Sequence, residues 1–258
     1  MWKSFAIAAA VSLAVAQAQG AELKVFVGGA MTETVTKISE DFARTSGHKL
    51  EIVSDTTGAL LNKMKAGEKP DVVVVTEAAV DGLQKDGALV DGTRTTLVRA
   101  LVGVAVKAGS TTSPDLSSVD AFKRSLLAAK TVSYVDPKAG GTSGTYFEGL
   151  LAKMGIAEQM KPKIVYRTTG AGVADAVATG AGELGVTFIA ELSPNKGVKI
   201  AGPLPNEIQL PTNYLAAVPK VSANQQAARA FIQAMTAPAG EAVFRAAGLQ
   251  PLPAHEGH

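Results

Sequence analysis

Short apolar runs alternate with amphipathic stretches along most of this chain, and this alternation restricts the possible folds more than any other feature. Leu23–Val27 is an apolar run that ends in two glycines, and residues 32–44 follow with apolar side chains at helical spacing. The run at 71–76 holds four consecutive valines, as a buried central strand does. Strands that alternate with helices form mostly parallel sheets covered by helices. The sequence therefore predicts an α/β fold.

The remaining elements continue the same order. We expect further strands at 49–53, within 97–107, and at 131–135, 163–166, 184–189 and 214–218. We expect further helices at 57–64, 80–85, 121–128, 145–154, 172–179, 222–235 and 240–246. No unit of about 20–50 residues recurs, which excludes a solenoid.

The first twenty residues have the three parts of a secretory signal peptide. Lys3 supplies a positive charge, residues 5–15 are apolar, and Ala16-Gln17-Ala18 is a small-x-small cleavage pattern. The apolar part is shorter than the roughly 20 residues that span a bilayer. We predict cleavage after Ala18 and export to the periplasm. Trp2, the single tryptophan, is then lost with the signal peptide.

Composition excludes several classes of function. The chain has no cysteine, which excludes disulfide frameworks, iron–sulfur clusters, thiol nucleophiles and a lipid-bearing N-terminal cysteine. Its 25 basic and 23 acidic residues give a net charge of +2, too small for a protein that tracks nucleic-acid phosphates. The three histidines, His48, His255 and His258, indicate neither a zinc-ligand set nor a catalytic triad. We therefore predict no catalytic residue, no cofactor, no metal and no nucleic-acid partner.

Glycine, serine and threonine gather at four junctions between a predicted strand and the helix that follows it. These junctions are 28–32, 55–59, 140–145 and 167–172. Glycine allows close backbone approach, serine and threonine offer hydroxyl groups, and a helix N-terminus presents free N–H groups to an anion. One such turn is usually a simple helix cap, whereas four in one exported α/β chain predict a shared anion site. Gly170-Ala171-Gly172 also resembles the start of a dinucleotide fingerprint, but Asp175 stands at its third glycine position, which makes a nucleotide the weaker alternative.

Five segments, in this order, resemble the periplasmic molybdate-binding proteins of ABC transporters. They are Lys24–Ile52, Thr56–Glu77, Val135–Gly155, Glu183–Leu192 and Ala230–Leu249. The resemblance implies a type II periplasmic binding protein, with two α/β lobes, each a mostly parallel sheet flanked by helices, and a two-strand hinge near 101–106 and 215–218. We expect the first lobe at 19–101 and 216–258, the second at 102–215, and a ligand enclosed between them by hinge closure.

The resemblance also implies which residues bind the ligand. The family's first loop carries a serine that binds the oxyanion, and Ala30 stands at that position, whereas the serine of the second loop corresponds to Thr57. The family's backbone donors correspond to Ser143 and Gly170, and its tyrosine corresponds to Phe188, which has no hydroxyl. Each lost donor to a charged group costs roughly 1.5–3 kcal/mol. Either other donors replace the two that are missing, or the ligand is different.

Arg167 provides the alternative ligand. A guanidinium binds a carboxylate through two parallel hydrogen bonds, and Ala30 and Phe188 add apolar surface, so a small organic carboxylate is the rival of an oxyanion. A surface or inter-lobe salt bridge is the non-functional alternative for Arg167. The full set of predicted ligand-binding residues is Gly29, Ala30, Met31, Thr56, Thr57, Gly58, Thr76, Thr142, Ser143, Gly144, Arg167, Thr169, Gly170 and Phe188.

Three classes of function are compatible with this site. The leading hypothesis is a monomeric periplasmic solute-binding protein that delivers a small anion to an ABC permease in the inner membrane and does not itself span the membrane. A sensor subunit that signals to a membrane receptor is the second. An exported enzyme is the third, and it requires a titratable pair in the cleft, whereas the nearest carboxylates in the sequence, Asp71 and Asp136, have no evident partner.

Overall fold

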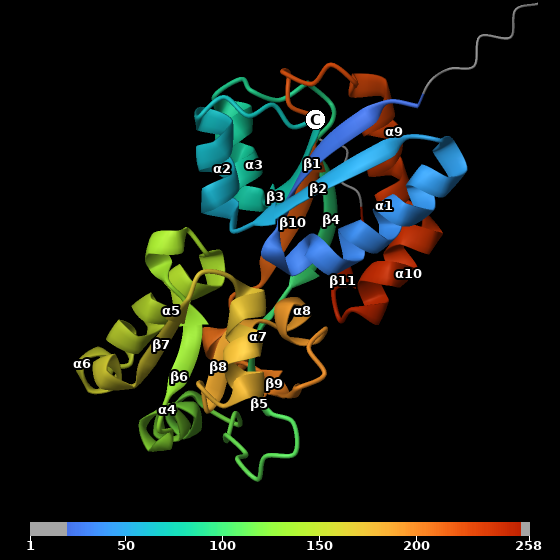
Figure 1. The fold of residues 1–258 in the computed structure, drawn as a ribbon. Coiled ribbons are helices and arrows are strands. Elements are labelled where there is room, and N and C mark those ends of the chain that lie inside the picture. The colour runs from blue at the N-terminus through green and yellow to red at the C-terminus, as the bar shows by residue number, and fades with distance from the viewer. Residues whose placement is uncertain (1–19, 254–258) are drawn as a thin grey trace, which may run out of the picture.

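The computed structural model describes residues 20–253 of the chain. The predicted signal peptide at 1–18 lies outside the described residues. Two lobes, each built on one sheet, lie next to each other, with the six-stranded sheet in the upper lobe of Figure 1 and the five-stranded sheet in the lower. The predicted α/β class is confirmed.

The sheet of the first lobe has the strand order β11-β4-β10-β3-β1-β2. Its strands are β1 (Glu22–Gly28), β2 (Lys49–Asp55), β3 (Val72–Thr76), β4 (Thr95–Ala100), β10 (Thr212–Ala217) and β11 (Gln250–Pro251). β1 pairs in parallel with β2 and β3, and β10 runs antiparallel to β3 and β4. The described chain therefore begins and ends in the same sheet.

Helices cover both faces of this sheet. They are the 3-10 turn η1 (Gly29–Met31), α1 (Thr32–Ser46), α2 (Thr57–Lys65), α3 (Glu77–Lys85), α9 (Gln225–Thr236) and α10 (Pro238–Ala246). In Figure 1, α1, α9 and α10 lie on one side of the sheet, and α2 and α3 on the other. Residues 25–27 of β1 are all apolar because alternate residues of the strand face opposite layers: Val25 belongs to the cluster that includes Phe231 of α9, and Phe26 to the cluster that includes Leu60 of α2.

The second lobe has the strand order β7-β6-β8-β5-β9. Its strands are β5 (Val102–Lys107), β6 (Val132–Val135), β7 (Ile164–Arg167), β8 (Leu184–Phe188) and β9 (Val198–Pro203). Its helices are α4 (Val119–Ala128), η2 (Pro137–Ala139), α5 (Thr142–Lys153), α6 (Ala157–Met160), η3 (Lys161–Lys163), α7 (Gly170–Thr179), α8 (Ile189–Leu192) and η4 (Asn206–Ile208). β6 pairs in parallel with β7 and β8, whereas β5 is antiparallel to β8 and β9.

The chain crosses between the lobes twice. The first crossing is Leu101, which separates β4 from β5, so the single extended run expected within 97–107 is divided between two sheets. The second crossing is residues 204–211, between β9 and β10, and the boundary expected at 215/216 falls inside β10. Gln209 joins the two crossings: its side chain accepts from the Val102 N–H at 2.9 Å and donates to the Val102 carbonyl at 2.9 Å.

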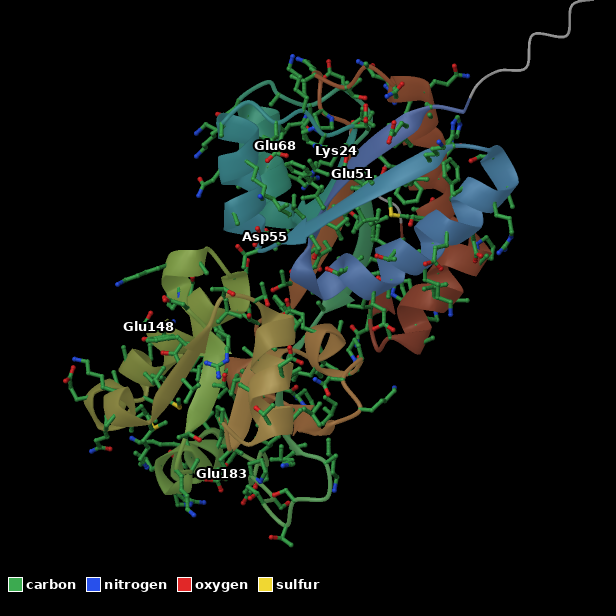
Figure 2. All side chains as sticks on the ribbon, viewed as in Figure 1. Lys24, Glu51, Asp55, Glu68, Glu148 and Glu183 are labelled. Atoms are coloured by element: carbon green, nitrogen blue, oxygen red, sulfur yellow. The ribbon has the colours of Figure 1, made fainter. Side chains whose placement is uncertain are left out.

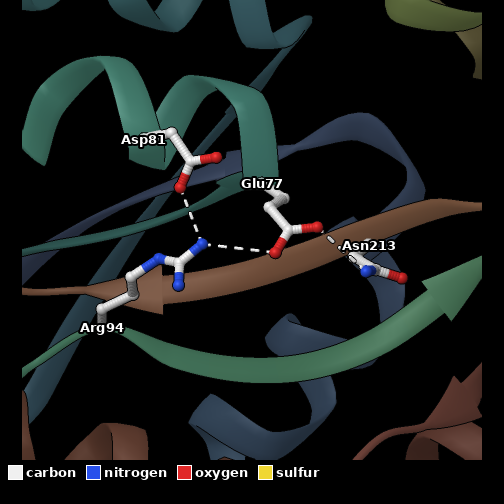
Figure 3. A network of polar contacts seen from close by, with 4 residues as sticks. All are labelled: Glu77, Asp81, Arg94 and Asn213. Atoms are coloured by element: carbon white, nitrogen blue, oxygen red, sulfur yellow. Dashed lines mark hydrogen bonds and ion pairs between the residues drawn. The ribbon is translucent and has the colours of Figure 1, made fainter. Parts of the chain in front are cut away.

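A polar network fixes α3 to the strands beside it (Figure 3). Arg94 contacts Asp81 at 2.7 Å and Glu77 at 3.2 Å, and Asn213 of β10 donates to Glu77 at 3.0 Å. These side chains keep partial exposure, so their ion pairs add only modestly to stability. Their effect is to hold α3 against β10, the strand that returns from the second lobe.

Candidate functional site

A cavity of about 460 Å³ lies between the two lobes. We call it the inter-lobe cavity, and it is lined by Gly29, Thr32, Glu33, Ser54, Asp55 and Thr56 of the first lobe and by Thr169, Gly170, Ala171, Ala174, Asp175, Ala190, Glu191, Pro194 and Asn195 of the second. Figure 2 shows Asp55 at the end of β2 that faces the second lobe. The cavity lies beyond the carboxyl ends of β1, β2 and β7, where open α/β sheets bind their ligands.

The walls of the cavity are built from strand-to-helix turns. Gly29 opens η1 directly after β1, and Gly170 opens α7 after the two threonines that follow β7. Thr169 caps α7 by accepting the Gly172 N–H at 3.2 Å. Thr56 caps α2 in the same way, with the Ala59 N–H as donor at 3.2 Å. Helix N-termini therefore reach the cavity from both lobes, and each presents N–H groups that suit an anion.

Glu191 brings a carboxyl group to the place where these turns meet. It belongs to the short helix α8, whose first N–H, of Ile189, donates to the Leu101 carbonyl at the first crossing at 3.0 Å. A methyl group added to Gly29 would collide with Glu191 Oε1, and one added to Gly170 would collide with Glu191 Cδ. The carboxyl group thus lies between a turn of the first lobe and a helix N-terminus of the second.

Hydroxyl groups, and no cation, accompany this carboxyl group. Thr187 of β8 donates to Glu191 Oε2 at 2.5 Å, and the Ser143 and Thr187 hydroxyls form a hydrogen bond of 3.0 Å. Burial raises the pKa of Glu191 to about 7, and the Thr187 hydrogen bond opposes this rise only in part. A carboxyl group that titrates near neutral pH therefore faces a cavity of solute size.

Two aromatic rings lie behind Glu191. Tyr214 of β10 is 2% exposed, and its ring meets the ring of Phe188 edge to face, with centroids 5.9 Å apart. Burial, and to a smaller extent the nearby Glu191 carboxylate, raises the pKa of Tyr214. The phenol that Phe188 lacks is therefore supplied to the same region by a residue from the other lobe.

The structure brings several predicted site residues together. Gly29, Thr56, Thr169 and Gly170 line the inter-lobe cavity. Ser143 and Phe188 lie behind Glu191, as described above. Thr57 is 9% exposed, and a methyl group added to Gly28 would lie 3.4 Å from its hydroxyl and 3.0 Å from the Tyr214 ring.

Other predicted residues lie away from the cavity walls. Ala30 and Met31 belong to the hydrophobic core, and Gly144 lies so close to the Val135 carbonyl that no side chain fits there. Thr76 is buried and pairs in the sheet with Tyr214, and Thr142 opens α5 without lining the cavity. These positions fit the helix-cap and core alternatives.

Arg167 does not line the inter-lobe cavity. It ends β7, and its Nη1 donates to the carbonyl of its own neighbour Tyr166 at 2.8 Å. The aliphatic part of its side chain lies beside Gly172 in the first turn of α7, and the contact of Arg167 with a ligand stays a prediction. In the part of the chain that the structure describes, the charged side chains that line the cavity are Glu33, Asp55, Asp175 and Glu191, so the donors available to an anion there are neutral.

Thr56 and Gly58 also hold the two lobes together. The Thr56 hydroxyl donates to the Ala139 carbonyl at 2.5 Å, and the Gly58 N–H donates to the Gly140 carbonyl at 3.1 Å. We call these two hydrogen bonds the lobe–lobe contact. They close the cleft beside the cavity and engage two groups that the sequence analysis assigned to the ligand. Among residues 20–253, no three acidic or histidine side chains are grouped so as to hold a metal ion.

Sequence reasoning missed Glu191, Thr187 and Tyr214. The helix that carries Glu191 has four residues, too few to show helical periodicity. The pattern around Thr187 indicates only a strand, and Tyr214 reaches the site through the antiparallel pairing of β10 with β3. A glutamate just after a buried strand, beside the four turns, is the one signal that was available.

Comparison with known proteins decides the family. The model of the family described as "Bacterial extracellular solute-binding protein" matches residues 23–250, almost all of the chain that the structure describes. This chain belongs to that family. Among residues 20–253 of this solute-binding protein, no helix is both long enough and apolar enough to cross a bilayer.

Two curated relatives of this solute-binding protein have different names. An aconitate isomerase from a Pseudomonas species is 30% identical over 241 residues, covering 90% of this chain and 88% of its own. A molybdate-binding protein from Azotobacter vinelandii is 29% identical over 251 residues, covering 94% and 95%. The predicted resemblance to molybdate-binding proteins is thus confirmed at the level of the family. The two relatives differ in function by name, since one is named as an isomerase and the other as a binding protein.

Solved structures agree on the fold. The structure of the Azotobacter vinelandii periplasmic molybdate-binding protein matches with a TM-score of 0.72 and 22% identity, covering 90% of this chain and 99% of that one. A sulfate-binding protein from Mycobacterium tuberculosis matches with a TM-score of 0.70 and 15% identity, covering 90% and 88%. The predicted type II periplasmic binding fold is confirmed.

Proposed function

We propose that this protein binds a small anion in the inter-lobe cavity and delivers it to an ABC permease in the inner membrane. The observation that carries the proposal is the position of the Glu191 carboxyl group between Gly29 and the N-terminus of α7. The turns of this site already enclose a carboxyl group that accepts from the Thr187 hydroxyl, and the carboxyl group of a bound solute needs donors of the same kind.

Within this proposal we favour a small organic carboxylate over a tetrahedral oxyanion as the ligand. The volume of about 460 Å³ lies in the range of about 300–1,000 Å³ that is usual for pockets that bind organic ligands. The group that lies between the turns is itself a carboxylate. The molybdate-binding relative supports the oxyanion, so both classes belong in the test.

The experiment is mass spectrometry of ligand released from purified protein, followed by calorimetric titration with molybdate, tungstate, sulfate and a panel of di- and tricarboxylates. We expect one carboxylate per chain and no heat with the oxyanions. Thr57→Val should weaken the binding, since it removes a hydroxyl from the site, and Arg167→Ala should leave it unchanged. Tight binding of molybdate would refute the carboxylate assignment, and binding of no anion at all would refute the proposed function.

Export to the periplasm and action as a monomer belong to the same proposal. The family and the signal-like N-terminus support export. Mass spectrometry of the protein from a periplasmic extract tests the predicted cleavage after Ala18, and light scattering tests the monomer. A chain retained in the cytoplasm with residues 1–18 intact would contradict the first of these.

A second candidate function is the isomerisation of an unsaturated carboxylate. The observation that favours it is the Glu191 carboxyl group, which lines the inter-lobe cavity and has a pKa raised to about 7. The relative named aconitate isomerase supports the same function. Moving a proton between two carbons requires one group that takes the proton and returns it, and such a group works best when its pKa lies near the working pH. Proton NMR of cis- and trans-aconitate in D₂O with the protein would show interconversion and deuterium uptake, both abolished in Glu191→Gln. Unchanged spectra would exclude this candidate for aconitate.

A further inference from the structure

We propose that the Glu191 carboxylate is an internal anion that occupies the anion subsite of the cleft and competes with the solute for it. The proposal rests on the proposed function, that this cleft binds a small anion, and names the residue that sets its affinity and selectivity. Glu191 is then a specificity-determining residue, because only an anion that outcompetes a covalently attached carboxylate enters the subsite.

The contacts of the carboxyl group are those of a ligand that bridges two lobes. One side of it meets Gly29 of the first lobe, and the other meets Gly170 at the start of α7 in the second. At both positions the absence of a side chain makes the room. Thr187 donates to it at 2.5 Å, and Ser143 supports Thr187 from the start of α5 at 3.0 Å.

The surroundings make this carboxylate replaceable. Within residues 20–253, no lysine or arginine lines the cavity, and no ion pair holds the Glu191 carboxylate. The acidic groups that face the cavity from the neighbouring elements are Glu33 of α1, Asp55 of β2 and Asp175 of α7, and Tyr214 of β10 lies behind. Burial is what disfavours the charge on Glu191, and the side chain lines the same cavity that the solute would enter.

A free carboxylate of the same size tests the proposal. Removing the side chain in Glu191→Ala leaves a space that matches formate or acetate, with the Thr187 and Ser143 hydroxyls still in place. We expect formate to bind this variant at least about tenfold more tightly than it binds the wild type, as measured by calorimetric titration and by the rise in melting temperature with formate concentration. Glu191→Gln fills the same space, so formate should bind it no better than it binds the wild type.

Glu33→Ala is the matched control. It removes one carboxylate from the same cavity, but Glu33 is exposed on α1 and does not lie between the turns. If Glu33→Ala and Glu191→Ala bind formate equally well, the effect is general charge repulsion and the proposal is wrong. If neither formate nor acetate binds Glu191→Ala better than the wild type, the proposal is wrong as well. Glu191→Asp keeps the charge but shortens the side chain, so its affinity for formate should lie between those of the wild type and Glu191→Ala. It replaces the alanine variant in the test if that variant does not fold.

The two proposals fail in different ways. Wild-type protein that binds no anion from the wider panel refutes the proposed function, whatever formate does to the variant. Wild-type protein that binds its carboxylate with an affinity unchanged in Glu191→Ala refutes the internal anion alone. Improved binding of that carboxylate to Glu191→Ala supports both.

Discussion

Glu191 is an acid whose environment favours its neutral form. The raised pKa, about 7 against 4.5 for a free side chain, means that the folded protein holds a proton that the unfolded chain releases between these values. The neutral carboxyl group therefore carries no penalty below about pH 4.5. The penalty for ionising it grows as the pH rises and is complete above about pH 7.

The first prediction concerns this pH dependence. Glu191→Gln cannot ionise, so its free energy of unfolding should rise relative to that of the wild type between about pH 4.5 and pH 7, and the difference should stay constant above that range. Urea unfolding at a series of pH values measures it. Parallel curves for the two proteins would show that the Glu191 pKa is not raised in the folded state.

The second prediction concerns a glycine at the site. Gly170→Ala places a methyl group where Glu191 Cδ lies, so the flexible glutamate must move and the anion subsite is filled. We expect anion affinity to fall by at least about tenfold, equivalent to about 1.4 kcal/mol. Gly82→Ala in α3, which meets nothing within 4 Å, is the control and should stabilise the protein by about 0.5–1 kcal/mol without changing affinity. Calorimetry and thermal unfolding measure both variants, and equal affinities would contradict the placement of Glu191.

For single residues, the sequence predicted the turn residues that line the cavity better than it predicted the Glu191 carboxyl group between them. Gly29, Thr169 and Gly170 follow from local turn chemistry, because a strand-to-helix junction determines where its own N–H groups point. Tyr214 lies in a strand whose antiparallel pairing depends on the whole sheet, and no local pattern indicates that its ring meets Phe188.

Among the elements, α2 performs two tasks with one residue. The Thr56 hydroxyl caps the helix by accepting from Ala59 N–H and forms half of the lobe–lobe contact by donating to Ala139. Loss of a threonine cap alone costs about 1 kcal/mol. Loss of the bond to Ala139 should act on the separation of the lobes as well.

The third prediction separates these two effects. Thr56→Val should lower the free energy of unfolding by about 1–2 kcal/mol and also increase the radius of gyration of the solute-free protein. Ser118→Ala removes a cap of the same kind from α4, where Ser118 accepts from Ala121 N–H at 3.1 Å, far from the first lobe. Small-angle scattering should show no expansion for Ser118→Ala. Equal radii for both variants would mean that the lobe–lobe contact does not hold the cleft closed.

The sequence predicted a helix or strand correctly where the segment had a hydrophobic pattern of its own. The prediction failed where one apolar run contained two strands. The valine run of β3 and the amphipathic α1 are found from the sequence within a few residues. The run within 97–107 is apolar on both sides of Leu101, so periodicity gives no sign that its halves pair in different sheets. β9 was not predicted, because its residues alternate between half-buried and exposed positions at the edge of its sheet.

For the whole molecule, the two crossings are the places where we expect the lobes to hinge. The Gln209 amide accepts from the Val102 N–H and donates to the Val102 carbonyl, so the two crossings are fixed to each other at this point. A hinge whose two strands are joined bends as a unit.

The fourth prediction tests this joint. Gln209→Ala should reduce the free energy of unfolding by about 1–3 kcal/mol, since the Val102 N–H loses its partner, while the Val102 carbonyl keeps the Leu204 N–H. Hydrogen exchange at Val102 should accelerate while exchange in the centres of both sheets keeps its rate. Gln209→Glu keeps the acceptor of the Val102 N–H but loses the donor to the Val102 carbonyl. Its free energy of unfolding should lie between those of the wild type and Gln209→Ala. Unchanged exchange at Val102 in Gln209→Ala would show that the amide does not join the crossings.

The return of the chain to its first sheet also limits how this protein can be turned into an optical sensor. β1 and β11 belong to the sheet of the first lobe. Fluorescent proteins attached before β1 and after β11 would therefore both be fixed to that lobe, and the distance between them would change little during closure. One of the pair must instead be inserted into the second lobe, for which the exposed connection at 108–118, between β5 and α4, is the natural place.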